Sequence, residues 1–260
     1  MQSFKRFSQL FPALLIVAIG GLSGLAAAPV SAWDWGFGAK VSGSGNIKSE
    51  RRNVSGFTGI SLAVPASADV VQGGSEGISI ETDDNILPLI ETVVDGGQLK
   101  IRFKDRNMAV STKTLRMTIN VKTIDSLSVA GSGDLRAAKL QTTKLKSSIA
   151  GSGDVRIASL DADTLTVSIA GSGDFSAGGK ANQVKAEIAG SGDLRIDKLA
   201  ANNVKLSIAG SGDAAVWAKD TLTISVAGSG DVTYYGDAKV SQSVAGSGSV
   251  KRLGNAPAGN

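Results

Sequence analysis

The chain has 260 residues, of which 33 are glycine and only 5% are aromatic, and its 27 basic and 23 acidic side chains give a net charge of +4. It contains no cysteine and no histidine, which excludes disulfides, thiolate zinc sites, cysteine nucleophiles and every catalytic triad that uses an imidazole. The near balance of charge, without a run of Lys or Arg, argues against nucleic-acid binding.

The first 32 residues have the anatomy of a secretory signal peptide. Lys5 and Arg6 form a basic start, residues 10–19 are apolar, and Val30-Ser31-Ala32 is a small-residue cleavage site. The alternative is an uncleaved anchor, because the apolar stretch continues to residue 28 and approaches the length of a membrane span. Cleavage would leave a mature chain of net charge +2 without a stable membrane span. Such a protein is expected in the periplasm, on the outer-membrane surface or outside the cell.

Residues 33–125 are expected to form irregular β coils and a cap. Alternating apolar positions predict strands over residues 57–62, 68–72, 78–82, 98–103 and 115–121. The pair Asp84-Asn85 before residues 86–90 predicts a short capped helix with Pro88 in its first turn. The stretch from Ser42 to Ala130 would fill about four coils at the period of the following repeats, and its cap would cover the open strand edge.

A pentapeptide repeat, Ala-Gly-Ser-Gly-Asp, organises residues 126–252. Six copies and a seventh that ends in Ser249 follow one another at intervals of 18 to 20 residues; they begin at Ala130, Ala150, Ala170, Ala189, Ala209, Ala227 and Ala245. Apolar residues alternate with Ser, Thr, Lys and Arg on both sides of each Gly-Ser-Gly turn, which is the pattern of a strand with one wet face. A unit this short cannot bury its own apolar face, so it must stack on its neighbours.

These features predict an all-β protein, a single-chain parallel β-helix or solenoid with coils of about 20 residues. Parallel stacking would place equivalent residues of successive coils about 4.8 Å apart, and right-handed crossover is the general rule for parallel strands. Both glycines of each motif are expected to supply the positive φ that a tight corner needs. Residues 253–260 are expected to form a flexible tail.

Four kinds of segment follow one another in a recognisable order: Phe57-Thr58-Gly59-Ile60-Ser61-Leu62, then Ala68-Asp69-Val70-Val71-Gln72-Gly73, then Asp84-Asn85-Ile86-Leu87, then the tandem Gly-Ser-Gly-Asp turns. Together they resemble the bacterial head GIN domain family, described as a "putative autotransporter adhesin", over residues 41–252. The resemblance implies a parallel β-helix exported across the inner membrane, and it supplies no catalytic residue.

The aspartates of the six complete turns are expected to form a ladder: Asp134, Asp154, Asp174, Asp193, Asp213 and Asp231. Carboxylates about 4.8 Å apart repel by roughly 1 kcal/mol even in water, so something must offset the charge. Calcium is one answer, because Gly-x-Gly-x-Asp echoes part of the calcium-binding nonapeptide of toxin repeats, although the period here is twice as long. The other answer is structural: Arg136, Arg156 and Arg195 follow two residues after an aspartate, and turn amides can bond carboxylates.

Trp217 and Tyr235 occupy the fourth position after the aspartate in consecutive coils. We expect this position to point outward, which would stack the two rings as an exposed platform suited to sugar rings or a protein partner. The alternative is that the rings shield the last coils, where the core ends.

The sequence therefore predicts an exported, non-catalytic, adhesin-like binding protein of the cell envelope that contacts a glycan or an envelope protein through a lateral face. A second possibility is a scaffold that self-associates by stacking coils end to end. A calcium-assisted polysaccharide-active enzyme is the third. Against it, the charged residues are spread evenly along the repeats, whereas a catalytic site needs one convergent cluster.

Overall fold

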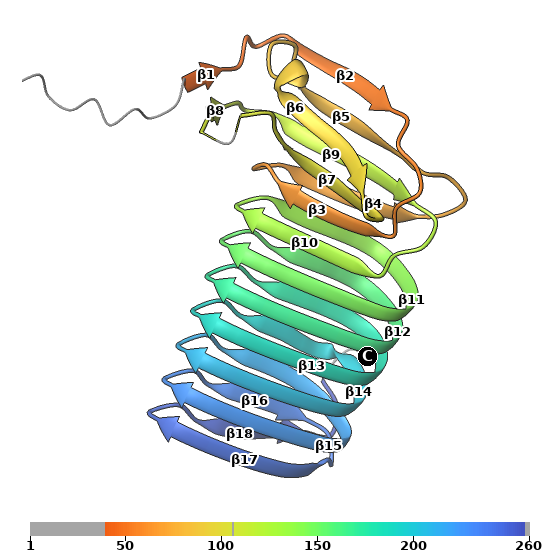
Figure 1. Ribbon diagram of the computed structural model, residues 1–260. Coiled ribbons are helices and arrows are strands. Elements are labelled where there is room, and N and C mark those ends of the chain that lie inside the picture. Colours follow the sequence, from red (N-terminus) through yellow and green to blue (C-terminus); the bar gives the residue numbers. More distant parts are fainter. Residues whose placement is uncertain (1–39, 106, 258–260) are drawn as a thin grey trace, which may run out of the picture. The chain divides into compact units, whose positions relative to one another are not determined.

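Stacked coils form most of the molecule, as Figure 1 shows for a computed structural model of the chain. The structure describes residues 40–105 and 107–257, and all of them belong to the compact unit of residues 37–260. The predicted signal peptide and cleavage site lie outside the described residues. Within the described ranges, no helix is long and apolar enough to cross a membrane.

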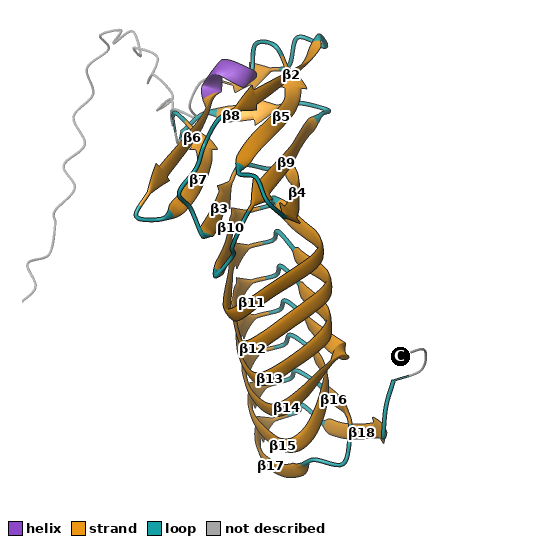
Figure 2. Cartoon of the chain, turned by 90° about the vertical axis from the view of Figure 1, so that its right-hand side faces the viewer, coloured by secondary structure: helices purple, strands orange, loops and turns teal. Residues whose placement is uncertain are grey.

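The repeat region is a parallel β-solenoid. Each of its long strands runs around one coil, from one pentapeptide to the next, and pairs in parallel with the coils before and after it (Figure 2). Its strands are β10 (Ser126–Gly131), β11 (Asp134–Gly151), β12 (Val155–Gly171), β13 (Phe175–Gly190), β14 (Leu194–Gly210), β15 (Ala214–Gly228), β16 (Val232–Tyr235), β17 (Lys239–Gly246) and β18 (Val250–Gly254). The predicted fold class is confirmed, and β18 extends two residues into the predicted tail.

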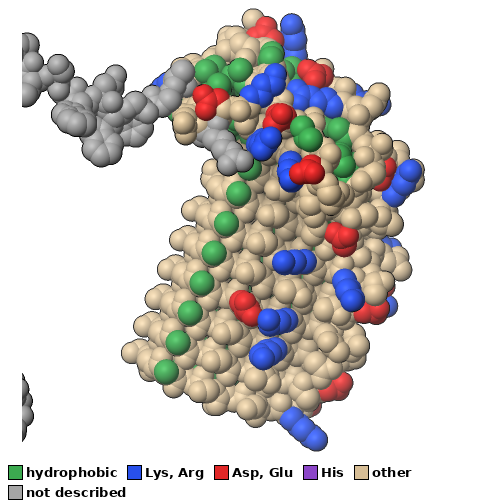
Figure 3. Space-filling view, in the orientation of Figure 1, with side chains coloured by type: hydrophobic (Ala, Val, Ile, Leu, Met, Phe, Trp, Pro, Cys, Tyr) green, Lys and Arg blue, Asp and Glu red, His purple; other side chains and the backbone are tan. Residues whose placement is uncertain are grey.

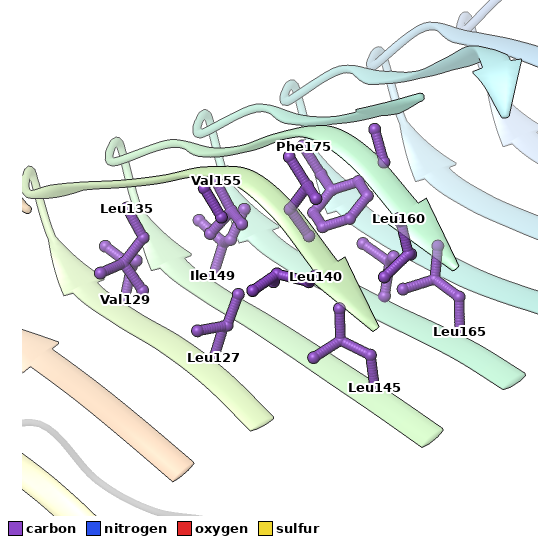
Figure 4. Packing of buried hydrophobic residues seen from close by; sticks show 14 of the residues in the cluster. Leu127, Val129, Leu135, Leu140, Leu145, Ile149, Val155, Leu160, Leu165 and Phe175 are labelled. Atoms are coloured by element: carbon purple, nitrogen blue, oxygen red, sulfur yellow. The ribbon is translucent and has the colours of Figure 1, made fainter. Parts of the chain in front are cut away.

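The register places the same repeat position of each coil in one interior column. Leu135 pairs with Val155, Val155 with Phe175 and Phe175 with Leu194, and each of these side chains is at most 1% exposed. Figure 4 shows Leu135, Val155 and Phe175 of this column packing against residues from the second part of the long strands, such as Ile149. Burial of each such side chain contributes about 1.5 to 3 kcal/mol. One interior position is polar, because Ser147 is fully buried and its hydroxyl has no hydrogen-bond partner.

The two glycines of each pentapeptide have different roles, which corrects the expectation that both supply a positive φ. The first glycine has a positive φ, for example +125° at Gly171. The second, for example Gly173, does not, but a Cβ built there would lie 2.1 Å from the carbonyl oxygen of Gly153 in the preceding coil. The second glycine is therefore needed because the backbones of neighbouring coils approach too closely for any side chain.

The N-terminal region begins with two parallel layers on the array and ends in antiparallel strands. Strands β3 and β4 stack on β10 and β11, and β7 and β9 stack on β3 and β4. Beyond them β6 pairs with β7, β5 with β9 and β2 with β5, all antiparallel. The bounds are β1 (Lys40–Ser42), β2 (Ile47–Arg52), β3 (Gly59–Ala63), β4 (Ser67–Gln72), β5 (Gly77–Asp83), β6 (Ile90–Asp95), β7 (Gln98–Phe103), β8 (Ala109–Ser111) and β9 (Leu115–Val121).

All five strands predicted here are present, but the estimate of about four coils is wrong. Gly96 and Gly97 both have positive φ, +58° and +75°, between β6 and β7, and two such residues form the tight turn of a hairpin. The chain therefore reverses instead of winding on. This reversal makes the antiparallel pair β6–β7, and the pairs β5–β9 and β2–β5 complete the antiparallel cap.

The predicted capped helix is a single 3₁₀ turn, η1 (Leu87–Leu89), with Pro88 at its start and Ile86 at its N-cap position, where no side chain makes a capping hydrogen bond. Asp84 and Asn85 instead hold the segment after β1. Ser44 Oγ donates to Asp84 Oδ1 at 2.5 Å, and the Ser44 amide donates to Asn85 Oδ1 at 3.0 Å. The cap prediction is wrong because these side chains find partners 40 residues away in the sequence.

Arg52 closes the N-terminal end of the solenoid. From β2 its guanidinium donates to the carbonyl oxygen of Ile90, the first residue of β6, at 2.7 Å and to that of Leu87 in η1 at 2.9 Å. Its Nε also bonds Glu50 at 2.6 Å. The outermost strand β2 is rich in charge, with four ionisable side chains in the six residues Ile-Lys-Ser-Glu-Arg-Arg. Charged edge strands resist pairing with another chain.

Candidate functional site

The arginines singled out from the sequence form one row across the outside of the array. Arg136 pairs in register with Arg156, Arg156 with Ser176, and Ser176 with Arg195. All three arginine side chains are exposed. The register thus gathers them on one lateral face, the face formed by the first part of each long strand, and Ser176 interrupts the row.

The turn aspartates form a hydrogen-bonded ladder along the edge of this face. In four consecutive steps a carboxylate Oδ1 accepts a hydrogen bond from the backbone N–H of the aspartate in the next coil, at 2.8 to 3.1 Å; the acceptors are Asp154, Asp174, Asp193 and Asp213. Asp231 ends the ladder by accepting from both the amide and the hydroxyl of Ser249, each at 2.8 Å. The carboxylates therefore connect successive corners by hydrogen bonds.

Arg156 and Arg195 bind the second carboxylate oxygen of ladder aspartates, and Arg136 binds Asp134, which, in the described part of the chain, accepts no ladder bond from the next coil. Arg156 contacts Asp154 Oδ2 at 2.6 Å, and Arg136 contacts Asp134 Oδ2 at 3.2 Å. Arg195 bridges two coils, with one nitrogen 2.8 Å from Asp193 Oδ2 and the other 3.2 Å from Asp174 Oδ2. Both structural partners expected from the sequence, amides and arginines, are thus present in the ladder.

The candidate calcium ligands lie in a line, not in a cluster. Within residues 40–105 and 107–257, no three carboxylates converge as a metal site would require. A cation at Asp154 or Asp193 would have to compete with the guanidinium that already bonds each carboxylate, although Asp213 and Asp231 have no arginine partner within the described residues. Calcium binding stays a prediction.

Trp217 and Tyr235 lie side by side on consecutive coils, since they are paired in register between β15 and β16. Both rings are half-buried. The Trp217 ring borders the backbone of Gly236 in the next coil, because a Cβ built on Gly236 would lie 3.5 Å from Trp217 Cδ1. Lys219 Nζ lies 5.8 Å from the centroid of the same ring, within range of a cation–π contact. The Trp217 ring therefore lies against the backbone of the next coil and stays partly accessible. The platform and the shielding interpretations both stay predictions.

A groove of about 490 Å³ crosses this lateral face, and the sequence interpretation missed it. Its floor is Gly178-Gly179 of β13, and Arg195, Asp197 and Lys198 contribute to its polar lining. Gly179 has φ +107°, and a Cβ there would lie 2.2 Å from the carbonyl oxygen of Leu160. At these glycines the register of β13 shifts relative to both neighbouring strands, β12 and β14. The signal was in the sequence: Gly178-Gly179 replaces two side-chain-bearing positions of the repeat.

The candidate residues do not meet at one point. Arg195 lines the groove and Trp217 pairs with Ala200, two residues beyond Lys198. Arg136 in β11, by contrast, is five coils from Tyr235 in β16, or roughly 24 Å along the axis at the strand spacing of a sheet. One small molecule could not touch them all, whereas an extended partner could.

Comparison with proteins of known structure finds close counterparts of this fold. A protein from Bacteroides fragilis described as a "putative adhesin" is 28% identical, with a TM-score of 0.77, and the match covers 82% of this chain and 100% of that one. A protein from Parabacteroides distasonis described as a "putative lipid binding protein" is 25% identical, with a TM-score of 0.71 and coverage of 82% and 99%. A Parabacteroides merdae "putative adhesin" at 20% identity, TM-score 0.63 and coverage of 83% and 100%, shares the fold.

The comparison with curated proteins finds no match. The family model described as "Putative auto-transporter adhesin, head GIN domain" matches residues 56–238, which begin just before β3 and extend through β16. This match covers most of the chain and includes both the N-terminal layers and the groove. The chain belongs to the head GIN domain family.

Proposed function

We propose that this protein is exported to the cell envelope and binds an extended partner, a glycan chain in the first instance, along the lateral face that carries Arg195 and Trp217. Family membership supports an adhesin-like role, and the adhesin description of the Bacteroides fragilis protein agrees with it. The signal-peptide pattern of residues 1–32 supports export. The proposed role is binding without catalysis, in keeping with descriptions of the family and of the solved relatives as adhesin or lipid-binding proteins.

One observation carries the proposal: a groove and an aromatic pair lie on the same face and in neighbouring coils. Aromatic rings offer an apolar surface with a polar tip, and such residues concentrate binding energy at interfaces. The groove adds charged groups of both signs, from Asp197 and Lys198, that can bond hydroxyl or carboxylate groups. A ligand pocket of this kind has a few polar groups to fix orientation.

The length of the face favours a polymer over a single sugar. The interval between successive coils is about 4.8 Å, and the arginine row and the aromatic pair together span β11 to β16. A flexible chain that contacts several coils gains affinity from each contact. A short oligosaccharide, which reaches the groove alone, should bind more weakly than a long one of the same composition.

A glycan array on the purified protein, run with calcium and with a chelator, tests the proposal. We expect binding that increases with oligosaccharide length and that falls at least about tenfold in Trp217→Ala, in line with the loss of an interface aromatic. Lys146→Ala is the matched control and should bind as well as the parent. Lys146 is exposed on the face formed by the second part of each long strand, which is the face of the array that Figure 3 shows. Absence of binding across the array, or equal loss in both variants, would refute the glycan proposal.

The same samples separate the remaining possibilities. Binding that disappears with the chelator would assign calcium to the aspartate ladder. Shortened or unsaturated products from a bound polysaccharide would make the protein an enzyme. Retention on phospholipid vesicles without glycan binding would place it with the relative described as lipid-binding. Cell fractionation and N-terminal sequencing of the purified protein test export and cleavage after Ala32.

A further inference from the structure

Strand β17 is the last strand on its face of the array, and one of its two edges is free. It pairs with β15 on one side, and within the described ranges no strand pairs with its other side. In a parallel ladder, successive residues direct their backbone groups alternately to one neighbour and the other. The Ser247 amide donates to Gly228 of β15 at 3.0 Å, so the odd-numbered residues face β15. The N–H and C=O groups of Val240, Gln242 and Val244 therefore point away from the array.

The same three residues continue the interior columns of the solenoid. Val240 pairs with Leu222, Gln242 with Ile224 and Val244 with Val226. In the preceding coil those partners are at most 2% exposed, but Val240 and Val244 are each 38% exposed. The free edge thus presents unpaired backbone groups and apolar side chains together, a combination that templates the addition of another strand.

The two ends of the solenoid are unlike. At the N-terminal end, one face ends in β2 with four charged side chains, and the face that contains β17 ends in β6, where Glu91 and Asp95 are charged and Arg52 bonds the Ile90 carbonyl. Strand β17 has only Lys239, at its first position, and no proline. Strand β18, which pairs with β16 on the other face, carries Lys251 and Arg252, and Arg252 bonds the Gly236 carbonyl at 2.9 Å. Head-to-tail stacking would join β17 to β6 and would set the basic strand β18 against the basic strand β2, whereas the sequence of β17 suits a contact with its own kind.

We propose that two copies of this chain join through β17 in a closed, two-fold symmetric, tail-to-tail dimer. The segment Val240-Ser241-Gln242-Ser243-Val244 reads the same in both directions. Antiparallel pairing centred on Gln242 therefore sets Val240 opposite Val244 of the second copy and Gln242 opposite its own counterpart. All three facing pairs use the outward-pointing backbone groups, so they are of the hydrogen-bonded kind, in which each pair exchanges two N–H···O bonds.

This register preserves the interior and sets no like charges opposite each other within β17. The valines of the two copies pack against each other and close the exposed end of the core. The two Gln242 amides meet at the symmetry axis, where a pair of polar side chains in an apolar setting fixes register and partner. A slip of one residue would turn the valines outward. Lys239 lies opposite Ala245 of the second copy, with no cation facing it.

Sedimentation equilibrium of the purified full chain, as the cell processes it, tests the dimer. We expect twice the monomer mass in the micromolar range, without growth into longer species at higher concentration. Gln242→Lys places two ammonium groups at the axis and should weaken association at least about tenfold, because like charges in contact repel strongly where water is excluded. Ser225→Lys adds the same charge at an exposed outward position one coil earlier and should leave the dimer intact.

A cross-linking experiment fixes the register, because the chain has no native cysteine. In Gln242→Cys the two Cα atoms would lie about 5.5 Å apart, within disulfide range. In Ser243→Cys the symmetry mates would be offset by two residues, at roughly 7 to 8 Å, which is too far. Mild oxidation should therefore give a covalent dimer for the first variant alone.

Three results would overturn the proposal. A monomer at all concentrations would show that the edge is covered or inert. Filaments that grow with concentration would show head-to-tail stacking. A dimer that survives Gln242→Lys, or that cross-links equally in both cysteine variants, would place the interface elsewhere. Glycan binding by the lateral face is a separate property, so either proposal can fail while the other stands.

Discussion

The repeat array and the N-terminal region hold their layers together by different means. In the array, backbone lies against backbone: corner amides bond the preceding corner, as Ser172 bonds Gly151 at 2.9 Å, and the glycines leave no room for side chains. In the N-terminal region, long-range side-chain contacts add to the backbone ladders: Arg52 of β2 donates to the Ile90 carbonyl of β6, and Thr112 donates to Asp83 of β5. A uniform stack can thus be built from one repeated corner, whereas its end needs individual side chains.

The largest effect should follow from filling a corner of the array. Gly173→Ala places a Cβ 2.1 Å from the Gly153 carbonyl without any change in the sign of φ, and such overpacking should cost about 3 kcal/mol or more. Gly96→Ala, in the N-terminal hairpin, has a positive φ but open space around it, and should cost about 1 kcal/mol. Thermal unfolding of both variants measures the difference. Equal losses would mean that conformation, not stacking, sets the need for glycine.

The next effect should come from removing the bridge at the N-terminal end. Arg52→Ala deletes two hydrogen bonds from a charged donor to backbone carbonyls, at Ile90 and Leu87, and should destabilise the protein by about 2 kcal/mol. Hydrogen exchange should accelerate in β6 and η1 and stay unchanged in β13. The matched control Arg51→Ala alters the exposed neighbouring side chain and should leave exchange as it is. Faster exchange throughout the array would contradict a local role.

A smaller effect of opposite sign is expected inside the array. Ser147→Ala removes a fully buried hydroxyl that has no hydrogen-bond partner, and should stabilise the protein by about 1 kcal/mol. Ser148→Ala, at the adjacent outward position, should change the unfolding free energy very little. Denaturant unfolding compares the two. A destabilised Ser147→Ala would show that the hydroxyl does have a partner in solution.

The smallest effect concerns acid. The Thr112 hydroxyl and the Gly45 amide donate to Asp83 at 2.6 and 2.7 Å, and these bonds hold the pKa of Asp83 below its ordinary value. Because the folded pKa is the lower one, the stabilisation is full above the ordinary range near pH 4 and is lost as pH falls through the folded pKa. Protection of residues 43–46 against hydrogen exchange, measured relative to the intrinsic rate at each pH, should therefore fall at low pH in the parent chain. In Asp83→Asn this protection should be low already at neutral pH; full protection there would refute the role of the charge.

The sequence determines the array more completely than its end. Alternating residues such as Val155 and Phe175 fix which side faces the core, and the pentapeptide fixes the corners, so the parallel coils were predictable. The same alternation cannot tell parallel from antiparallel pairing, since side chains alternate in both. For the pair β6 and β7, the turn residues Gly96 and Gly97 carry that information.

The candidate site was predictable in part. The rows of Arg156 and Trp217 follow directly from the repeat, because equal positions stack. The groove depends instead on a departure from the repeat, at Gly178-Gly179, where missing side chains and shifted register open a space. Likewise, Asp84 and Asn85 form hydrogen bonds with Ser44, which is distant in the chain. The local helix propensity of the sequence contains no information about such contacts.

Coils of 18 to 20 residues stack on one another with one cross-section, so related proteins can diverge by gaining or losing whole coils. Loss or duplication of one whole period, for example residues 150–169, would leave both termini of the stack untouched and shift Arg136 relative to Trp217 by a single step of about 4.8 Å. The axial distance between contact points can therefore change only in steps of one coil. Gain or loss of whole periods would lengthen or shorten the binding face without requiring a new arrangement of core side chains.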